Sequence, residues 1–510
     1  MSEKRSNAVD LSHHLSDIAK TLEPRSFGLD TDPGSINLDG GAPDIEYFPI
    51  ESLQVQYLKP DAFPISPTDV LPHGSSFFGW IANMLTGKTP IAQFVVPRRL
   101  KAGDESVFEL KTALSYSGFE GLAPLQKTIR EWVTRVHKPA YNDYKTLIDL
   151  GATCAWNSAL TILLNPGEAF LTDRYAYNTA LAQGITRDAR VLATWDEKAR
   201  GLKRPRVIYT QGGVHNPAGI LISAQRKRDI YDVAVRYDLV VIEDDPYYFQ
   251  QASTPYIHGV APAPKQQTDD EWLDGLVPSF LQFDYQGRVL RLDTFSKSLG
   301  PGGRVGYYTG SPLLISKLLG LHQAYLTFPS GLSQAIFGEL LHRYKQEGFT
   351  RWLRGITAQY ELRRNWAIDT LYQCLDIRVQ NRALVAYAPT KGAMSEKFAH
   401  QSLLSFIPPD GGMFIWFAIH LHNHPRYQQL SHQTSPTEAK NALSLELFTN
   451  LINAGVVMRR GELFAVETDE ERASRGEDDI FLRAAFSSGT KEQLEKGFKI
   501  FAAQVVKFFQ

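Results

Sequence analysis

The middle of the chain alternates between short apolar runs and longer stretches with helical spacing of apolar residues. The apolar runs predict buried strands, of which 239–242 reads as a central parallel strand. The apolar runs lie at 169–172, 206–209, 239–242, 288–292 and 305–309. Helical patterns at 125–136, 147–164 and 224–237 separate or precede them. The alternation from about 145 to 310 predicts an α/β doubly wound domain with a mostly parallel sheet.

The flanking regions have a different pattern. The polar stretch 1–37 predicts an N-terminal arm with one short helix around 11–22. A long helical pattern at 349–374 is typical of a helix that links domains, and the tail reads as α+β, with strands at 413–419 and 481–487. Two polar segments, 251–286 and 422–437, predict surface insertions.

These patterns divide the chain into four parts. We expect an N-terminal arm at 1–37 and a segment at 38–100 that contributes to a small domain and to the entrance of the active site. A large ligand-binding domain follows at 101–370, and a small C-terminal α+β domain at 371–510.

Composition narrows the class of protein. Of the 510 residues 43% are hydrophobic and 21% charged, and the formal net charge is -1. This balance argues against nucleic-acid binding by bulk charge, and no apolar run is long enough to span a membrane. The two cysteines are too few for a disulfide framework or a zinc site, so we expect no metal. With no signal-peptide core at the N-terminus, these features predict a cytoplasmic protein.

Polar side chains cluster where the predicted strands end. Asn216 follows one strand, and three consecutive carboxylates at 243–245 follow the next. Such a run is costly at the end of a buried strand unless a cation or a metal pairs with it. The small residues around Ala152 open a helix, whose free N–H groups attract anions. Ligands of such sheets bind at the carboxyl ends of the strands, so we expect a site there.

The segment 293–307 carries the sharpest chemical signal. A strand delivers Asp293 and Thr294 to a glycine-rich turn that contains Ser296, Lys297 and Arg304. Taken alone, Lys297 is more often a solvated surface lysine. Beside hydroxyls and a guanidinium at a strand end, however, its amine suits a Schiff base with a phosphorylated carbonyl cofactor.

Four motifs in this order resemble the pyridoxal-phosphate aminotransferases of fold type I, class I/II, and within them the fungal aromatic amino acid and 2-aminoadipate aminotransferases. The motifs are Asn-Pro-x-Gly at 216–219, Glu-Asp-Asp-Pro-Tyr-Tyr at 243–248, Thr-Phe-Ser-Lys at 294–297 and Phe-Leu-Arg at 481–483. The resemblance runs from about Asn37 to the C-terminus. It implies a large domain with a mixed, mostly parallel sheet between helices, and a smaller α+β domain.

The resemblance also implies roles for individual residues. Lys297 would bind pyridoxal phosphate as a Schiff base and move the substrate proton, with Asp244 at the pyridine nitrogen and Tyr247 at the phenolic oxygen. Arg483, Asn216 and the glycines Gly40 and Gly41 would bind the substrate. The remaining cofactor contacts would come from Asn216, Tyr177, Thr294, Ser296, Arg304, Ala152, Thr153 and, from the neighbouring subunit of a homodimer, Tyr116.

The implied activity is ping-pong transfer of an amino group from an amino acid, aromatic as first choice, to 2-oxoglutarate. Three alternatives stay open at this point: a 2-aminoadipate aminotransferase, a broad-specificity one, and a pyridoxal-phosphate lyase or substitution enzyme on the same fold. The phosphate loop departs from the family where Ala152 replaces a polar residue. A regulator with a fused DNA-binding domain is disfavoured, because fewer than about fifty residues precede the resemblance.

Overall fold

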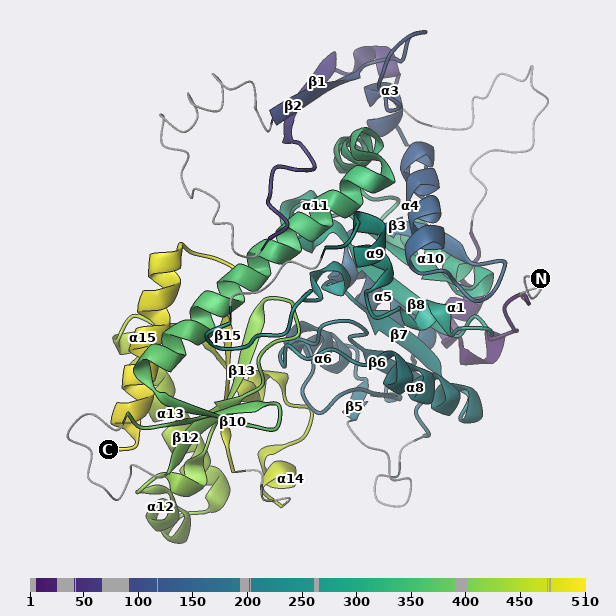
Figure 1. Ribbon diagram of the computed structural model, residues 1–510. Coiled ribbons are helices and arrows are strands. Elements are labelled where there is room, and N and C mark those ends of the chain that lie inside the picture. The colour runs from purple at the N-terminus through teal and green to yellow at the C-terminus, as the bar shows by residue number, and fades with distance from the viewer. Residues whose placement is uncertain are drawn as a thin grey trace, which may run out of the picture.

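The computed structural model describes residues 6–24, 41, 43–66, 91–116, 118–192, 201, 203–260, 266–389, 401–474, 476 and 478–510. They form two large sheets, each covered by helices and joined along the long helix α11 (Gly331–Cys374), and one two-stranded sheet (Figure 1). None of the helices among these residues has the length and apolarity needed to cross a membrane.

A seven-stranded sheet forms the centre of the larger part, in the order β3-β9-β8-β7-β6-β4-β5. Its pairs are parallel except that β9 runs antiparallel to both of its neighbours, which confirms the predicted mixed, mostly parallel sheet. β7 lies in the middle and is buried throughout, as its apolar run predicts. The strands are β3 (Lys145–Asp149), β4 (Ala169–Leu171), β5 (Arg190–Leu192), β6 (Val207–Thr210), β7 (Val240–Asp244), β8 (Val289–Thr294) and β9 (Gly306–Gly310).

Helices cover both faces of this sheet because successive strand residues point to opposite sides. Val240 and Ile242 of β7 pack in one core cluster with α5 and α10, whereas Val241 packs with α8 on the other face. The predicted helices 125–136 and 224–237 are present as α4 and α8. The helices of this part are α1 (Asp17–Thr21), α3 (Leu110–Ala113), α4 (Ala123–Val136), α5 (Ala152–Leu163), α6 (Asn178–Thr186), α8 (Ala224–Arg236), α9 (Asp269–Asp274) and α10 (Pro312–Tyr325).

The second sheet is antiparallel, in the order β10-β11-β12-β13-β15-β14. Its inner face shares an apolar core with α13, α15 and the C-terminal half of α11. Lys345 has non-helical backbone angles and kinks α11. The elements are β10 (Asp376–Gln380), β11 (Ala383–Tyr387), β12 (Ser402–Phe406), β13 (Phe414–Ile419), β14 (Arg459–Arg460), β15 (Ile480–Ala485), α12 (Tyr427–Gln433), α13 (Pro436–Asn453), α14 (Asp469–Ala473) and α15 (Lys491–Phe508).

Four features differ from the sequence-based expectation. The segment 251–286 is not only a surface insertion, because it contains α9, which has a capping box and buries Trp272 and Leu273. The segment 422–437 contains α12 and the first two residues of α13. Part of the predicted helix 147–164 is instead strand β3, and the hairpin of β1 (Ser52–Leu58) and β2 (Ile91–Pro97) was not predicted.

Candidate active site

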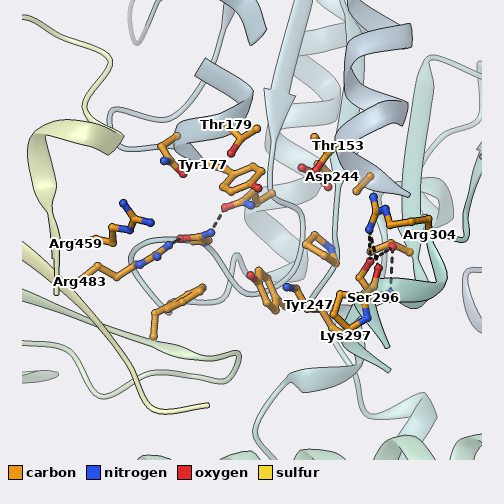
Figure 2. A pocket seen from close by; sticks show the side chains of 18 residues that line it. Thr153, Tyr177, Thr179, Asp244, Tyr247, Ser296, Lys297, Arg304, Arg459 and Arg483 are labelled. Atoms are coloured by element: carbon orange, nitrogen blue, oxygen red, sulfur yellow. Dashed lines mark hydrogen bonds between the residues drawn. The ribbon is translucent and has the colours of Figure 1, made fainter. Parts of the chain in front are cut away.

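A cavity of about 430 Å³ lies where the carboxyl ends of the large-sheet strands face the second sheet (Figure 2). It brings together every predicted site residue except Tyr116, Gly40 and Gly41. Tyr116 is 65% exposed and Gly41 is exposed, and neither lines the cavity; Gly40 lies outside the described residues. The lining residues are Ala152, Thr153, Tyr177, Asn178, Thr179, Gln211, Asn216, Asp244, Pro246, Tyr247, Thr294, Ser296, Lys297, Pro301, Arg304, Phe414, Arg459 and Arg483.

The three consecutive carboxylates at the end of β7, Glu243 to Asp245, point to two different sides of the strand. Glu243 and Asp245 point away from the cavity and contact Arg291, whose Nη1 lies 3.0 Å from Glu243 Oε2 and 3.4 Å from Asp245 Oδ2. Arg291 stands directly opposite Glu243 on the neighbouring strand β8. Lys227 Nζ lies 3.6 Å from Glu243 Oε1. The sequence left open whether a cation or a metal pairs with these carboxylates. In the structure, Arg291 and Lys227 compensate Glu243 and Asp245.

Two glycines after β6 leave room for this buried network. A Cβ on Gly212 would stand 2.2 Å from Glu243 Oε1, and one on Gly213 would stand 2.2 Å from Asp245 Oδ1. Arg291 also donates two hydrogen bonds of 2.8 Å to Asp293, just before the lysine loop. The network thus fixes the ends of β7 and β8 relative to each other.

Asp244 alternates to the opposite side and faces the cavity. Its Oδ2 accepts a 2.6 Å hydrogen bond from the Tyr209 hydroxyl, while its buried Oδ1 has no partner among the described residues. Burial raises the pKa of Asp244 to about 6, although the Tyr209 bond acts against this rise. A buried carboxylate oxygen aimed into a cavity is suited to a ligand that donates a hydrogen bond from a cationic ring.

Hydroxyls and a guanidinium gather at one end of the cavity. Thr294 Oγ1 donates to Ser296 Oγ at 2.9 Å and accepts from the Ser296 amide at 3.2 Å. Arg304 adopts a left-handed backbone conformation (φ 48°), and its Nη1 donates to Pro301 O at 3.0 Å and to Ser296 Oγ at 3.4 Å. These contacts hold three donors toward one point.

The N-terminus of α5 completes this end. Its cap, Gly151, has φ 108° and no side chain, so the first amides of the helix, at Ala152 and Thr153, face the cavity without a capping group. A Cβ at Gly151 would lie 3.0 Å from Arg304 Nη2 and 3.3 Å from Thr294 Oγ1. Free amides at a helix N-terminus beside a guanidinium and hydroxyls form a cradle for a phosphate.

Lys297 lies between the two ends of the cavity, on a short helical turn after β8. Its Nζ is 5.8 Å from the centre of the Tyr247 ring. Burial, with Arg304 and Arg483 adding repulsion, lowers the pKa of the Lys297 amine. A lowered pKa makes more of the neutral amine available as a nucleophile and as a base.

The opposite end of the cavity comes from the second sheet and the turn after β6 (Figure 2). Arg483 on β15 donates a 2.7 Å hydrogen bond from Nη1 to Asn216 Oδ1. Its guanidinium carbon lies 4.0 Å from the centre of the Phe414 ring and 4.7 Å from the centre of the Phe464 ring. Burial lowers the Arg483 pKa to about 10, and Arg459 contributes to that fall. This guanidinium is positioned to bind a carboxylate.

Sequence reasoning missed seven lining residues: Asn178, Thr179, Gln211, Pro246, Pro301, Phe414 and Arg459. Gln211 follows β6 directly, so the strand-end rule could have found it. Its Oε1 accepts a 2.7 Å hydrogen bond from the Asn216 amide and shapes that turn. Arg459 carries no such signal, because its strand β14 has only 2 residues.

Comparisons with known proteins identify the family of the chain. The family model of class I and II aminotransferases matches residues 81–501. The chain is 29% identical to an aromatic amino acid aminotransferase of Schizosaccharomyces pombe, over 98% of both chains. It is 30% identical to an L-tyrosine:2-oxoglutarate aminotransferase of Tapinella panuoides, over 98% of this chain and 96% of that one. The crystal structure of aminotransferase Aro8 from Candida albicans matches with a TM-score of 0.81, at 28% identity over 99% of this chain and 100% of that one.

Proposed function

The chain belongs to the family of class I and II aminotransferases, and from this premise we propose that it moves the amino group of an aromatic amino acid to 2-oxoglutarate. Membership confirms the predicted fold, enzyme class and cofactor, since the family depends on pyridoxal phosphate. The names of the relatives from Schizosaccharomyces pombe and Tapinella panuoides support the aromatic donor and the 2-oxoglutarate acceptor.

One observation carries the proposal most directly: the cavity presents complementary groups for each part of the cofactor. The cradle of Gly151, Thr294, Ser296 and Arg304 fits its phosphate, and the partnerless Oδ1 of Asp244 fits a protonated ring nitrogen. The lowered pKa of Lys297 fits an amine that attacks its carbonyl. When bound, pyridoxal phosphate supplies the carbonyl that receives the amino group and a ring that withdraws electrons from the substrate Cα.

The residues of the chain then divide the remaining work. Arg483 binds the substrate α-carboxylate. Asn216 accepts a hydrogen bond from Arg483 and so holds its guanidinium in the orientation that binding requires. Lys297 would take the proton from the substrate Cα and pass it to the cofactor carbon that carried the carbonyl. Asp244, kept in place by Tyr209, would stay ionised and accept a hydrogen bond from the protonated ring nitrogen of the cofactor. Tyr247 and Tyr177 line the same cavity.

We further propose that the protein is a homodimer in which Tyr116 reaches the phosphate of the neighbouring site. Tyr116 lies outside its own cavity, is 65% exposed and contacts Phe328 edge to face at 6.2 Å. Mixing Lys297→Ala with Tyr116→Phe subunits tests this, because a hybrid dimer has one intact site. Activity that rises on mixing supports shared sites, and activity that stays at the level of the variants contradicts them.

The cytoplasmic location also stays a proposal, and so do the four domain boundaries. Both cysteines, Cys154 and Cys374, are free thiols, which is consistent with a reducing compartment. Fluorescence microscopy of the tagged protein tests the location. Limited proteolysis tests the first two boundaries, which predict cleavage close to residues 37 and 100. The third boundary falls inside α11 (Gly331–Cys374), where Thr370 is buried, so no cleavage is expected there.

An absorption spectrum of the purified holoenzyme tests the proposed reaction. Phenylalanine or tyrosine, added without an oxo acid, is expected to replace the yellow band with that of the aminated cofactor, and 2-oxoglutarate is expected to restore it. A yellow protein that responds only to 2-aminoadipate would contradict the aromatic donor. Products other than a 2-oxo acid would favour the lyase or substitution alternative.

A further inference from the structure

A second arginine stands beside Arg483 at the substrate end of the cavity. Arg459 lies on the edge strand β14 and pairs directly with Arg483 of β15 in the antiparallel register. Residues opposite each other on neighbouring antiparallel strands project to the same face. Figure 2 shows both side chains extending toward the cavity, and both line it. Two like charges in this position repel each other, so the arrangement costs stability as it stands.

Arg459 is an exposed residue, and no group among the described residues compensates its charge. Among the residues that the structure describes, its guanidinium makes no hydrogen bond and no ion pair. Its neighbour Arg460 behaves differently: Nε lies 3.2 Å from Glu462 Oε2, and the side chain packs over Phe448 rather than in the cavity. Of these two adjacent arginines, Arg460 has a structural partner, whereas the charge of Arg459 is available to a ligand.

The charges that line the cavity indicate what kind of ligand it can bind. Four cations, Lys297, Arg304, Arg459 and Arg483, face a single carboxylate, Asp244. Under the proposed function, Arg304 receives the cofactor phosphate and Arg483 the substrate α-carboxylate. Lys297 acts chemically on the cofactor carbonyl. Arg459 then remains as a cation without an anion, next to the place where the substrate carboxylate binds.

We propose that Arg459 binds the distal carboxylate of a dicarboxylic 2-oxo acid and thereby selects the amino acceptor. The inference rests on the proposed function, and it extends that function by assigning the acceptor preference to one residue of β14. A dicarboxylate bridges Arg459 and Arg483, so it removes their mutual repulsion and gains a charge-assisted contact at each end. A monocarboxylic ligand gains only the contact with Arg483.

Binding of unreactive probes to the holoenzyme separates these contributions. Glutarate carries both carboxylates of the acceptor, whereas 3-phenylpropionate carries one carboxylate and an aromatic ring. Arg459→Gln is expected to weaken glutarate binding about 10- to 100-fold, the size of one lost charge-assisted contact. The affinity for 3-phenylpropionate is expected to stay within about threefold. Isothermal titration measures both.

Two further variants control the experiment. Arg459→Lys keeps the charge but not the planar donor pair, so it is expected to restore part of the glutarate affinity. Arg460→Gln changes the neighbouring arginine outside the cavity and is expected to bind both probes like the unmodified protein. In steady-state kinetics, Arg459→Gln is expected to raise KM for 2-oxoglutarate and to leave KM for a monocarboxylic 2-oxo acid within about threefold.

Unchanged glutarate affinity in Arg459→Gln would overturn the proposal, and so would an equal loss for the two probes. Failure of the proposed function has a different signature, a holoenzyme whose spectrum does not respond to aromatic amino acids. If glutarate binding still depended on Arg459 in such a protein, the result would support the dicarboxylate site at Arg459 and contradict the aromatic amino donor.

Discussion

The two ends of the cavity are built differently. The phosphate end comes from one sheet, where Thr294, Ser296 and Arg304 lie within a single short segment and hydrogen-bond with one another. The substrate end combines Asn216 from the large sheet with Phe414, Arg459 and Arg483 from three strands of the second sheet. It leaves one guanidinium without a partner.

The difference matches what each end has to bind. A cofactor that stays bound through many turnovers benefits from donors fixed in advance, because little order is lost when it binds. Substrates exchange at every half-reaction, and amino acid and oxo acid differ in shape. An end formed by two separately packed sheets can adjust to both. The predictions below test this division, beginning with the largest effect.

Replacement of Lys297 tests the residue that serves both ends. Lys297→Ala removes the nucleophile and the base, so the rate of the first half-reaction is expected to fall by about 10⁴-fold. Rapid-mixing absorbance with phenylalanine measures it. The variant should still take up pyridoxal phosphate, since the cradle is intact. A loss of less than about tenfold would contradict the assigned role.

Replacement of Arg483 tests the substrate end alone. Arg483→Gln is expected to weaken both 3-phenylpropionate and glutarate by about 100-fold, because every substrate carries the α-carboxylate. The affinity for pyridoxal phosphate should change by less than about threefold. Titration of both probes into the holoenzyme checks this, with Arg460→Gln as the matched control. A comparable loss of cofactor affinity would break the division between the ends.

Asp244 links cofactor binding to stability. Its pKa, raised from 3.8 to about 6 by burial, means that the folded apo-protein resists ionisation of this group. The apo-protein therefore has its full stability at a pH below the Asp244 pKa of the unfolded chain. It loses part of that stability as the pH rises through the Asp244 pKa of the folded protein. Asp244→Asn is therefore expected to stabilise the apo-protein by about 3 kcal/mol at pH 8 and by almost nothing at pH 4.

Urea unfolding of the apo-forms at both pH values measures the difference. The same variant should bind pyridoxal phosphate more weakly, because the ring nitrogen loses its anionic partner. Equal stability of both proteins at pH 8 would contradict the view that Asp244 is a strained group kept for the cofactor.

Gly151 tests the phosphate cradle. Gly151→Ala places a Cβ 3.0 Å from Arg304 Nη2 and strains the backbone at φ 108°. We expect the affinity for pyridoxal phosphate to fall about tenfold. Gly167→Ala is the matched control, since Gly167 has φ 81° but nothing within 4 Å of its Cβ position. It shares the backbone strain without touching the cradle. Equal cofactor affinity in the two variants would contradict the cradle.

The same contrast explains what the sequence could predict. The phosphate end is encoded locally: Lys297 and its hydroxyl and guanidinium neighbours lie within a few positions after a strand, and strand periodicity places them. The cations that pair with Glu243 and Asp245 could not be predicted, because Arg291 reaches them through the register of β7 and β8. Arg459 was missed because a strand of 2 residues has no periodicity.

Other outcomes follow from the same limits. Polar composition made 251–286 look like a plain insertion, although two apolar residues there, Trp272 and Leu273, anchor a helix. The roles of Tyr116 and Gly41 remain predictions, because neither residue lies in the cavity of its own chain. Contacts between subunits leave no trace in the spacing of a single sequence.

Reduction of the holoenzyme with borohydride, followed by digestion and mass spectrometry, tests the central claim most directly. The treatment fixes pyridoxal phosphate covalently to the amine that carries it. The account predicts a phosphopyridoxyl group on the peptide that contains Lys297, in near-stoichiometric amount, and its absence after prior addition of phenylalanine. Modification of any other lysine in the unsubstituted protein would contradict the account.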